Sequence, residues 1–123
     1  MIRDAEIRRL AGAAGVEPRI VELDYVLGWV LWGIAGNEYL SGRLVFKGGT
    51  CLRKCYLPDY RFSEDLDFTA TEWFGWEELK EAVNQAFSTA AELSGIDFAA
   101  QEPRMRITEE EYGRETLRLT HYW

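Results

Sequence analysis

Two aspartates separated by one residue are the first feature of this chain that could carry chemistry. Asp65 and Asp67 lie in a run, Asp65-Leu66-Asp67-Phe68-Thr69, that is typical of a β-strand. Side chains two residues apart in a strand point to the same face, about 6.5–7 Å apart along the chain. Two carboxylates in this arrangement can bind one or two Mg²⁺ ions, which also bind nucleotide phosphates. An exposed polar strand face would have the same pattern, so the pair alone does not identify a site.

A pair of glycines lies upstream, where a short apolar strand runs into a brief helix. Gly48 and Gly49 allow the backbone to turn sharply and to come close to a ligand, and Thr50 follows them. The start of a helix offers unpaired N–H groups and a positive dipole end to a phosphate. Thr50 could cap the helix or donate its hydroxyl to a phosphate oxygen. Most Gly-Gly pairs are simply turns, so this signal is weak by itself.

Basic side chains are concentrated around these two segments, although the net charge of the whole chain is −7. Between positions 43 and 61 a single acid, Asp59, is set against Arg43, Lys47, Arg53, Lys54 and Arg61. Such a cluster can be a solvated basic face. Beside the glycine pair and the aspartate pair, it favours a phosphate-binding surface, whereas the overall negative charge argues against indiscriminate binding of nucleic acid.

Taken together, the two segments resemble a known family. The runs 46–54 (FKGGTCLRK) and 61–68 (RFSEDLDF) resemble the signature of AbiEii/AbiGii-type nucleotidyltransferase toxins, which share the DNA polymerase β-like fold. Residues 21–27 are similar to the helix that precedes the first strand of that family. The resemblance covers most of residues 4–95, is specific over 46–68 and is weak after Gly95.

The resemblance implies roles for individual residues. Asp65 and Asp67 would be catalytic ligands of Mg²⁺ or Mn²⁺, and Ser63 would join them in the catalytic set. With Arg61, Ser63 matches the Arg-x-Ser-x-Asp run of the family, which would line or position the triphosphate. The implied nucleotide-binding residues are Lys47, Gly48, Gly49, Thr50, Arg53 and Arg61.

The resemblance also implies a reaction and partners. Family members transfer a nucleotide from an NTP to RNA, often tRNA, or to a protein hydroxyl, and they act as toxins paired with a separately encoded antitoxin. A third carboxylate on a later strand, and a Lys and an Asp on C-terminal helices, cannot be assigned here. Glu115 precedes a strand-like run but lacks the expected context. We therefore expect a chain truncated at its C-terminus, with doubtful turnover on its own.

Two other functions compete with this one. Asp65-x-Asp67-x-Thr69 also matches the first motif of haloacid-dehalogenase-type phosphatases. That motif needs an apolar buried strand before the first Asp, and residues 61–64 (RFSE) are too polar. The other alternative is a catalytically incomplete remnant that binds nucleotide or a protein partner without turning over.

The elements that must position these residues follow from hydrophobic periodicity. We predict helices near residues 7–14, 20–40 and 76–93, and a brief helix ending near Tyr56. Strands are predicted at 44–46, 65–69, 105–107 and 116–122, with 96–99 extended. On the longest helix, Tyr25, Trp29 and Trp32 form a second stripe that could dock a partner or another copy of the chain. The class is α/β or α+β, with a mixed sheet flanked by helices.

Length and composition set the remaining limits. The 123 residues allow one domain, a nucleotidyltransferase domain over 1–123 with a helical lead-in (1–42) and a nucleotide- and metal-binding core (43–123). No apolar run approaches the roughly 18 residues of a membrane span, so we expect no membrane partner. We expect the protein to be cytoplasmic. Cys51 and Cys55 are expected to be reduced and structural, and His121 has no partner for catalysis.

Overall fold

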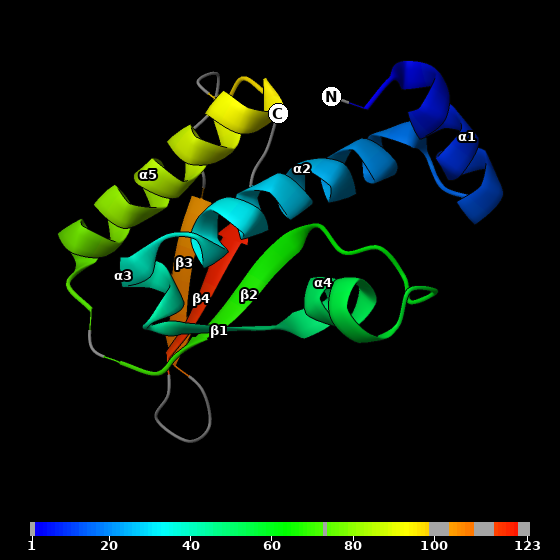
Figure 1. Cartoon of the computed structure of the whole chain (residues 1–123). Helices are drawn as coiled ribbons and strands as arrows, with labels where there is room; N and C mark the ends of the chain where they lie inside the picture. The colour runs from blue at the N-terminus through cyan, green and yellow to red at the C-terminus, as the bar shows by residue number, and fades with distance from the viewer. Residues whose placement is uncertain (1, 73, 99–103, 110–114, 121–123) are drawn as a thin grey trace.

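One layer of helices covers one face of an antiparallel sheet in the computed structural model (Figure 1). The structure describes residues 2–72, 74–98, 104–109 and 115–120. In chain order the elements are α1 (Asp4–Ala14), α2 (Pro18–Ala35), α3 (Glu38–Ser41), β1 (Leu44–Lys47), α4 (Gly48–Cys51), a π-helical segment η1 (Leu52–Tyr56), β2 (Asp65–Ala70), α5 (Trp76–Ser94), β3 (Arg104–Glu109) and β4 (Glu115–Thr120). The expected α+β class is confirmed.

The described strands lie in the order β1-β2-β4-β3, and every pairing between neighbours is antiparallel. The expected mixed sheet is therefore wrong over the described residues. The reason is topological: β4 inserts between β2 and β3, and β2 lies between β1 and β4, so strands that run in the same direction are never neighbours. The compact α4–η1 segment between β1 and β2 reverses the chain without a crossover, as antiparallel neighbours allow.

Strand β2 separates the two faces of the sheet. Leu66 and Phe68 are buried, whereas Asp65, Asp67 and Thr69 are only partly covered. This alternation is expected for an antiparallel sheet with one face packed against helices and the other open. The acidic pair therefore lies on the face opposite the hydrophobic core.

The core forms between α2, α3 and α5 and the inner face of the sheet. Both long helices place apolar residues at helical spacing on this side. Where they cross, Gly33 of α2 lies so close to the backbone of Ala86 in α5 that an added Cβ would overlap the Ala86 carbonyl. The largest fully buried side chains are Leu27, Leu40, Leu66, Leu79 and Leu117, with Val30, Val83 and Thr50. Helix α2, part of the expected lead-in, thus shares one core with the strands.

Two expected boundaries differ from the structure. The helix predicted over 20–40 ends at Ala35, because Asn37 starts a separate helix, α3, by accepting a hydrogen bond from the Leu40 N–H (3.1 Å). Residues 96–98 lie outside the sheet, with Ile96 and Phe98 packed against the core. Residue 99 lies outside the described part of the chain, as do 121–123 with His121. Among the described helices, none is long and apolar enough to cross a membrane.

Candidate active site

The glycine pair and the aspartate pair meet at one corner of the sheet, where β1 ends and β2 begins. Gly48 has a left-handed backbone (φ +85°), and an added Cβ would lie 2.6 Å from Oδ2 of Asp67. A Cβ on Gly49 would overlap the Ser63 hydroxyl. Gly48 therefore requires glycine, because of its left-handed backbone and the Asp67 side chain beside it, whereas a Cβ on Gly49 would displace only the end of the Ser63 side chain. The expected geometry, with both carboxylates on one face beside the turn, is confirmed.

The two carboxylates differ in exposure. The Asp65 side chain is 33% exposed and that of Asp67 only 13%. In the sheet register, Asp67 lies directly between Lys47 of β1 and Arg118 of β4. Residues directly opposite in an antiparallel pair share a face. Asp67 is thus flanked by a basic residue on each neighbouring strand.

Thr50 holds the turn to the strand that carries the aspartates. Its side chain is buried, and its hydroxyl donates a 2.6 Å hydrogen bond to the backbone carbonyl of Asp65. This oxygen is thus already engaged, and the side chain positions Asp65 instead of opening toward a phosphate as expected from the sequence.

Arg61 and Ser63 lie together beside the turn. The Arg61 guanidinium donates to the Ser63 hydroxyl (3.1 Å), and that hydroxyl faces Gly49. Arg61 is largely exposed, so its remaining N–H groups can reach a ligand from solvent. The structure thus places the Arg-x-Ser pair next to the glycine turn.

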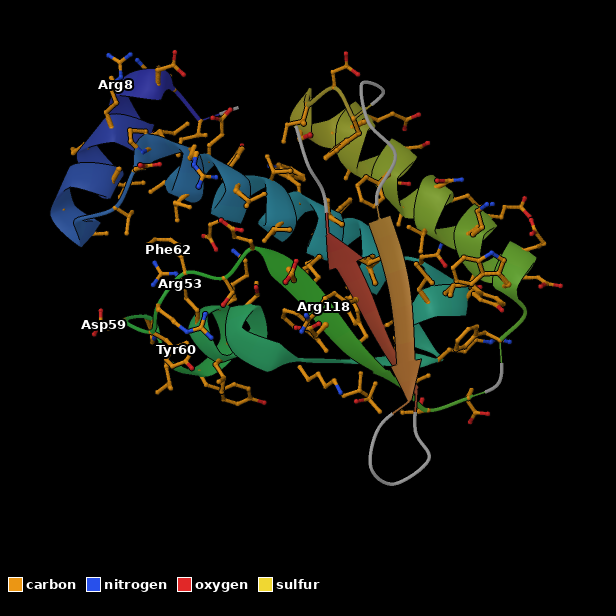
Figure 2. The ribbon with its side chains drawn as sticks, turned by 180° about the vertical axis from the view of Figure 1, so that it is seen from behind. Arg8, Arg53, Asp59, Tyr60, Phe62 and Arg118 are labelled. Atoms are coloured by element: carbon orange, nitrogen blue, oxygen red, sulfur yellow. The ribbon has the colours of Figure 1, made fainter. Side chains whose placement is uncertain are left out.

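Arg53 is engaged within the loop that leads to β2. Its guanidinium donates to the carbonyls of Pro58 (2.8 Å) and Tyr60 (2.6 Å) and stacks on Phe62, 3.6 Å from the ring centroid. Figure 2 shows Arg53 among Tyr60, Phe62 and Asp59 beside α4. These contacts brace the loop, so Arg53 supports the site in this structure and does not present its charge to the turn.

Lys54 is also engaged away from the turn. Its ammonium donates to the backbone carbonyl of Asp24 in α2 (3.1 Å) and lies 3.2 Å from the carboxylate Oδ1 of the same residue. This second contact is an ion pair without hydrogen-bond geometry. Lys54 thereby fastens η1 to α2.

Arg118 is a site residue that the sequence does not reveal. Its Nε lies 2.7 Å from Oδ1 of Asp67, to which it donates a hydrogen bond, and 3.9 Å from Oδ2 of Asp65. The bond to Asp67 raises the pKa of Arg118 above its ordinary value, so the guanidinium is a permanent cation. The alternation of Leu117 and Leu119 indicates that Arg118 faces the polar side of β4, but only the register with β2 brings it to the aspartates.

The two aspartates fit a divalent cation, because their carboxylates already converge on one cationic atom, Nε of Arg118. Oxygen ligands of this kind are those that Mg²⁺ prefers. Within the described residues, however, no group of three His, Cys, Asp or Glu side chains is arranged to hold a metal ion. A third carboxylate is thus missing from the described part of the site.

Glu115 begins β4 at the end of the strand away from Asp65. It opens β4 opposite Glu109 of β3, whereas Asp65 pairs with Thr120 at the other end of β4. Thr120 lies five positions after Glu115 in the strand, or about 16 Å along it. The backbone of Glu115 therefore lies at the far end of the strand.

The phosphatase alternative does not fit the local structure. Its motif needs a buried apolar strand that leads into the first aspartate. Asp65 is the first residue of β2, and residues 61–63 before it belong to no strand. Among the described residues, no other strand leads into Asp65 from the N-terminal side.

The two cysteines lie on the segment that follows the turn, and both are free. Cys51 is buried, and its thiol contacts the carbonyl of Phe46 (3.7 Å), whereas Cys55 is exposed. Burial, and secondarily the neighbouring Cys55, raises the pKa of the Cys51 thiol. Cys51 is thus packed as a small apolar group, as expected, whereas the exposed Cys55 does not fit the structural role expected for it.

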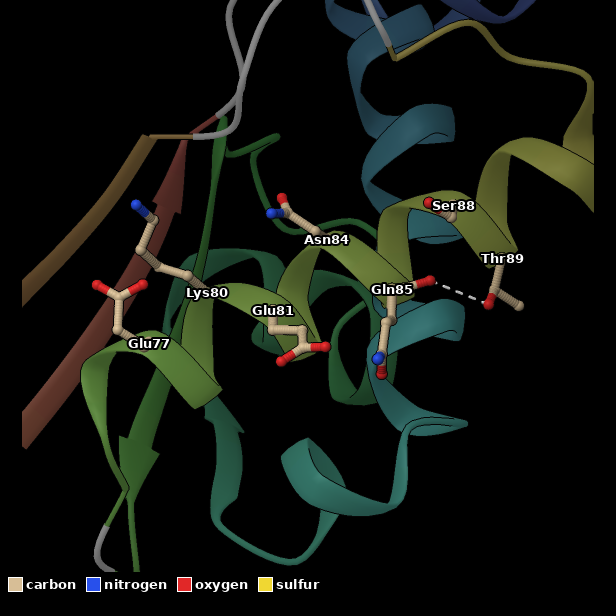
Figure 3. A pocket seen from close by; sticks show the side chains of 7 residues that line it. All are labelled: Glu77, Lys80, Glu81, Asn84, Gln85, Ser88 and Thr89. Atoms are coloured by element: carbon tan, nitrogen blue, oxygen red, sulfur yellow. Dashed lines mark hydrogen bonds between the residues drawn. The ribbon is translucent and has the colours of Figure 1, made fainter.

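Two hollows lie away from this corner. An apolar groove between α1, α2 and the end of α5 is lined by Tyr25, Trp29, Trp32, Leu10 and Leu93, with the Lys54–Asp24 pair at its edge. Trp32 is 50% exposed. A polar hollow runs along the outer face of α5, from Glu77 to Thr89 (Figure 3). Because all its lining residues come from the solvated side of one amphipathic helix, it carries no argument for a site.

Comparison with known proteins adds one finding. A family model described as the nucleotidyl transferase AbiEii toxin of a type IV toxin–antitoxin system matches residues 29–122. The matched range contains the glycine turn, the aspartate pair and Arg118. No curated protein and no solved structure matches the chain.

Proposed function

The chain belongs to the AbiEii family, the nucleotidyl transferase toxins of type IV toxin–antitoxin systems, and we propose that it transfers a nucleotide from an NTP to RNA, tRNA above all, or to a protein hydroxyl. The observation that carries this proposal is the corner where Asp65 and Asp67 share one face of β2 against the Gly48-Gly49 turn. A nucleotide-transfer site needs paired carboxylates and a phosphate-binding backbone side by side.

Asp65 and Asp67 would hold Mg²⁺ or Mn²⁺. When bound, the metal supplies positive charge that neutralises the triphosphate and the leaving pyrophosphate. Thr50 keeps Asp65 in place through the backbone carbonyl of that residue. The missing side chain of Gly48 leaves the space that Oδ2 of Asp67 occupies. A fixed pair of carboxylates favours transfer because the site needs little rearrangement when charge develops.

The turn and its neighbours would bind the triphosphate. The side chains of Asp67 and Ser63 fill the space that side chains at Gly48 and Gly49 would take, so a phosphate bound at this turn would lie beside both of them. Arg61 and Ser63, joined by a hydrogen bond beside Gly49, offer a guanidinium and a hydroxyl at the same place. Lys47, opposite Asp67 in the register, adds a basic residue at the end of β1. We therefore assign phosphate binding to this side of the aspartates.

An antitoxin is the partner that membership of this family suggests. We propose that a protein partner, whether the antitoxin or another copy of this chain, covers the groove of Tyr25, Trp29 and Trp32. Trp32 and Leu93 leave large apolar surfaces in water there, as interaction surfaces do. Light scattering on the chain and on Trp32→Glu tests the self-association. A monomer for both proteins would remove the second copy from consideration.

A catalytically incomplete remnant is the second candidate, and two observations favour it. Arg118 is bonded to Asp67, and the described residues contain no cluster of three potential ligands. A module of this kind would bind nucleotide through the same corner without transferring it. Binding and transfer must therefore be measured separately.

Label transfer from each α-labelled NTP to total RNA, with and without Mg²⁺, tests the proposal. We expect Asp65→Asn and Asp67→Asn to lower transfer by at least about 100-fold, because each removes a carboxylate charge from the metal site. Asp59→Asn, a matched change at an exposed position on the loop before β2, should leave transfer unchanged. Calorimetry should also show that Asp67→Asn loses the Mg²⁺-dependent part of NTP binding. NTP binding without any transfer would select the remnant.

A further inference from the structure

A positively charged side chain of the protein itself, that of Arg118, faces the two aspartates. Arg118 of β4 lies directly opposite Asp67 in the register and places Nε 2.7 Å from Oδ1 of Asp67 and 3.9 Å from Oδ2 of Asp65. Figure 2 shows Arg118 extending from β4 across the face of β2. One guanidinium thus faces both carboxylates that would serve as metal ligands.

This contact differs from an ordinary surface ion pair. The Asp67 side chain is only 13% exposed, and its other oxygen, Oδ2, occupies the space that a Cβ on Gly48 would need. A hydrogen bond between two charged groups is short and strong when one partner is largely withdrawn from water. With Oδ1 bonded to Arg118, that oxygen of Asp67 is not open to a second cation while the guanidinium stays in place.

Arg118 itself is much more exposed than Asp67. Its side chain is 49% exposed, so water already reaches about half of it. A guanidinium offers five N–H donors that suit phosphate as well as carboxylate. The phosphates of a nucleotide at the glycine turn would lie on the same side of the sheet.

We propose that Arg118 is a positioning residue that occupies the metal position of the nucleotide-free protein and moves to the triphosphate when metal and NTP bind together. Like charges repel, so metal and guanidinium do not share Oδ1 of Asp67. Nucleotide phosphates give the displaced guanidinium a new anionic partner. Arg118 thereby opposes binding of metal alone and favours joint binding of metal and nucleotide, which are linked reciprocally. This inference rests on the proposed function, because it takes Asp65 and Asp67 as the metal ligands.

The test measures binding of Mg²⁺ alone by calorimetry, without nucleotide. Arg118→Met, which removes the charge and keeps the length, should bind Mg²⁺ about 5–150-fold more tightly than the unchanged chain, the usual size of coupling between two sites. Arg118→Lys keeps the charge and should stay close to the unchanged chain. Arg8→Met, the same removal of charge at an exposed position on α1, should change nothing. Thermal melting of each variant verifies that it is folded.

A second titration follows NTP binding in Mg²⁺. Arg118→Met should bind NTP more weakly than the unchanged chain, and the mutual enhancement of Mg²⁺ and NTP should shrink. Equal or weaker binding of Mg²⁺ alone by Arg118→Met would overturn the inference, while the proposed function would stand if Asp67→Asn still abolished the Mg²⁺-dependent binding of NTP. Absence of Mg²⁺ binding in every protein, with transfer unaffected by Asp67→Asn, would overturn both.

Discussion

The corner at the glycine turn and the apolar groove of Tyr25, Trp29 and Trp32 differ in the interactions that form them. At the corner, groups from α4, β2 and β4 are packed closely, with Oδ2 of Asp67 in the space that a Cβ on Gly48 would need, and a short hydrogen bond joins Asp67 to Arg118. In the groove, Tyr25, Trp29 and Trp32 form an apolar surface with one ion pair at its edge. The corner should therefore tolerate almost no added atom, whereas the groove should respond mildly to single changes.

The largest effect is expected from Gly48→Ala. The new Cβ would meet Oδ2 of Asp67 at 2.6 Å on a residue with φ +85°, so both the turn and the carboxylate must shift. We expect a loss of about 1–3 kcal/mol in the free energy of unfolding. Transfer should fall by about 100-fold, since small misplacements of reacting groups reduce rates that much.

Gly12→Ala is the matched control for that variant. Gly12 lies inside α1, and an added Cβ would meet no atom within 4 Å. Alanine is the better helix former, so the variant should gain up to about 1 kcal/mol of stability. Denaturant unfolding and the label-transfer assay compare the two proteins. A stable and active Gly48→Ala would contradict the close approach of turn and carboxylate.

A smaller effect on stability is expected at Thr50, which is buried next to the corner. Thr50→Val removes the hydrogen bond to the Asp65 carbonyl while keeping the side-chain shape, which should cost about 0.5–1.5 kcal/mol. Thr50→Ser keeps the hydroxyl and loses a methyl group, so its stability should fall by a similar amount. Transfer activity separates the two variants. Only the valine variant should lose it, and equal activity in both would remove the positioning role of Thr50.

Changes to the Lys54–Asp24 ion pair at the edge of the groove should alter stability less. Lys54→Met and Asp24→Asn, alone and combined, measure the coupling between these side chains, which are 22% and 21% exposed. We expect about 0.5–1 kcal/mol in denaturant unfolding, the upper range for pairs in contact with water. Arg19 and Glu17, 69% and 74% exposed, form the control pair, with coupling near zero. Equal coupling in both pairs would show that partial burial adds nothing at the groove.

The corner was the more predictable of the two regions, because its signals are local. The i, i+2 spacing of Asp65 and Asp67 in a strand and the glycine pair after a strand correctly predicted a shared face beside a turn. Resemblance to a family added the Arg-x-Ser pair. The roles of these residues in binding and catalysis stay predictions.

What the sequence could not provide depends on contacts between distant segments. Arg118 reaches Asp67 only because β4 inserts beside β2, and no local pattern encodes that register. Likewise, the hydroxyl of Thr50 and the charge of Arg53 suit a phosphate when judged from the sequence alone. In the folded chain both groups are hydrogen-bonded to backbone carbonyls instead. The early end of α2 has a local signal, Asn37 as a helix cap, which the strong apolar periodicity of 20–40 outweighed.

The smallest expected effect is chemical labelling of the two cysteines, which reports how tightly the corner is packed. The thiolate is the reactive form, and the raised pKa of Cys51 lowers its thiolate fraction at any given pH. Iodoacetamide at neutral pH should thus modify exposed Cys55 first, and labelling of Cys51 should speed up as pH rises or when urea unfolds the chain. Mass spectrometry after proteolysis counts the alkyl groups at each position. In Gly48→Ala, a loosened α4 should label Cys51 faster, whereas Trp32→Glu in the groove should leave its rate unchanged. Equal labelling of both cysteines in the native chain would contradict the burial of Cys51 and, with it, the tight packing behind the glycine turn.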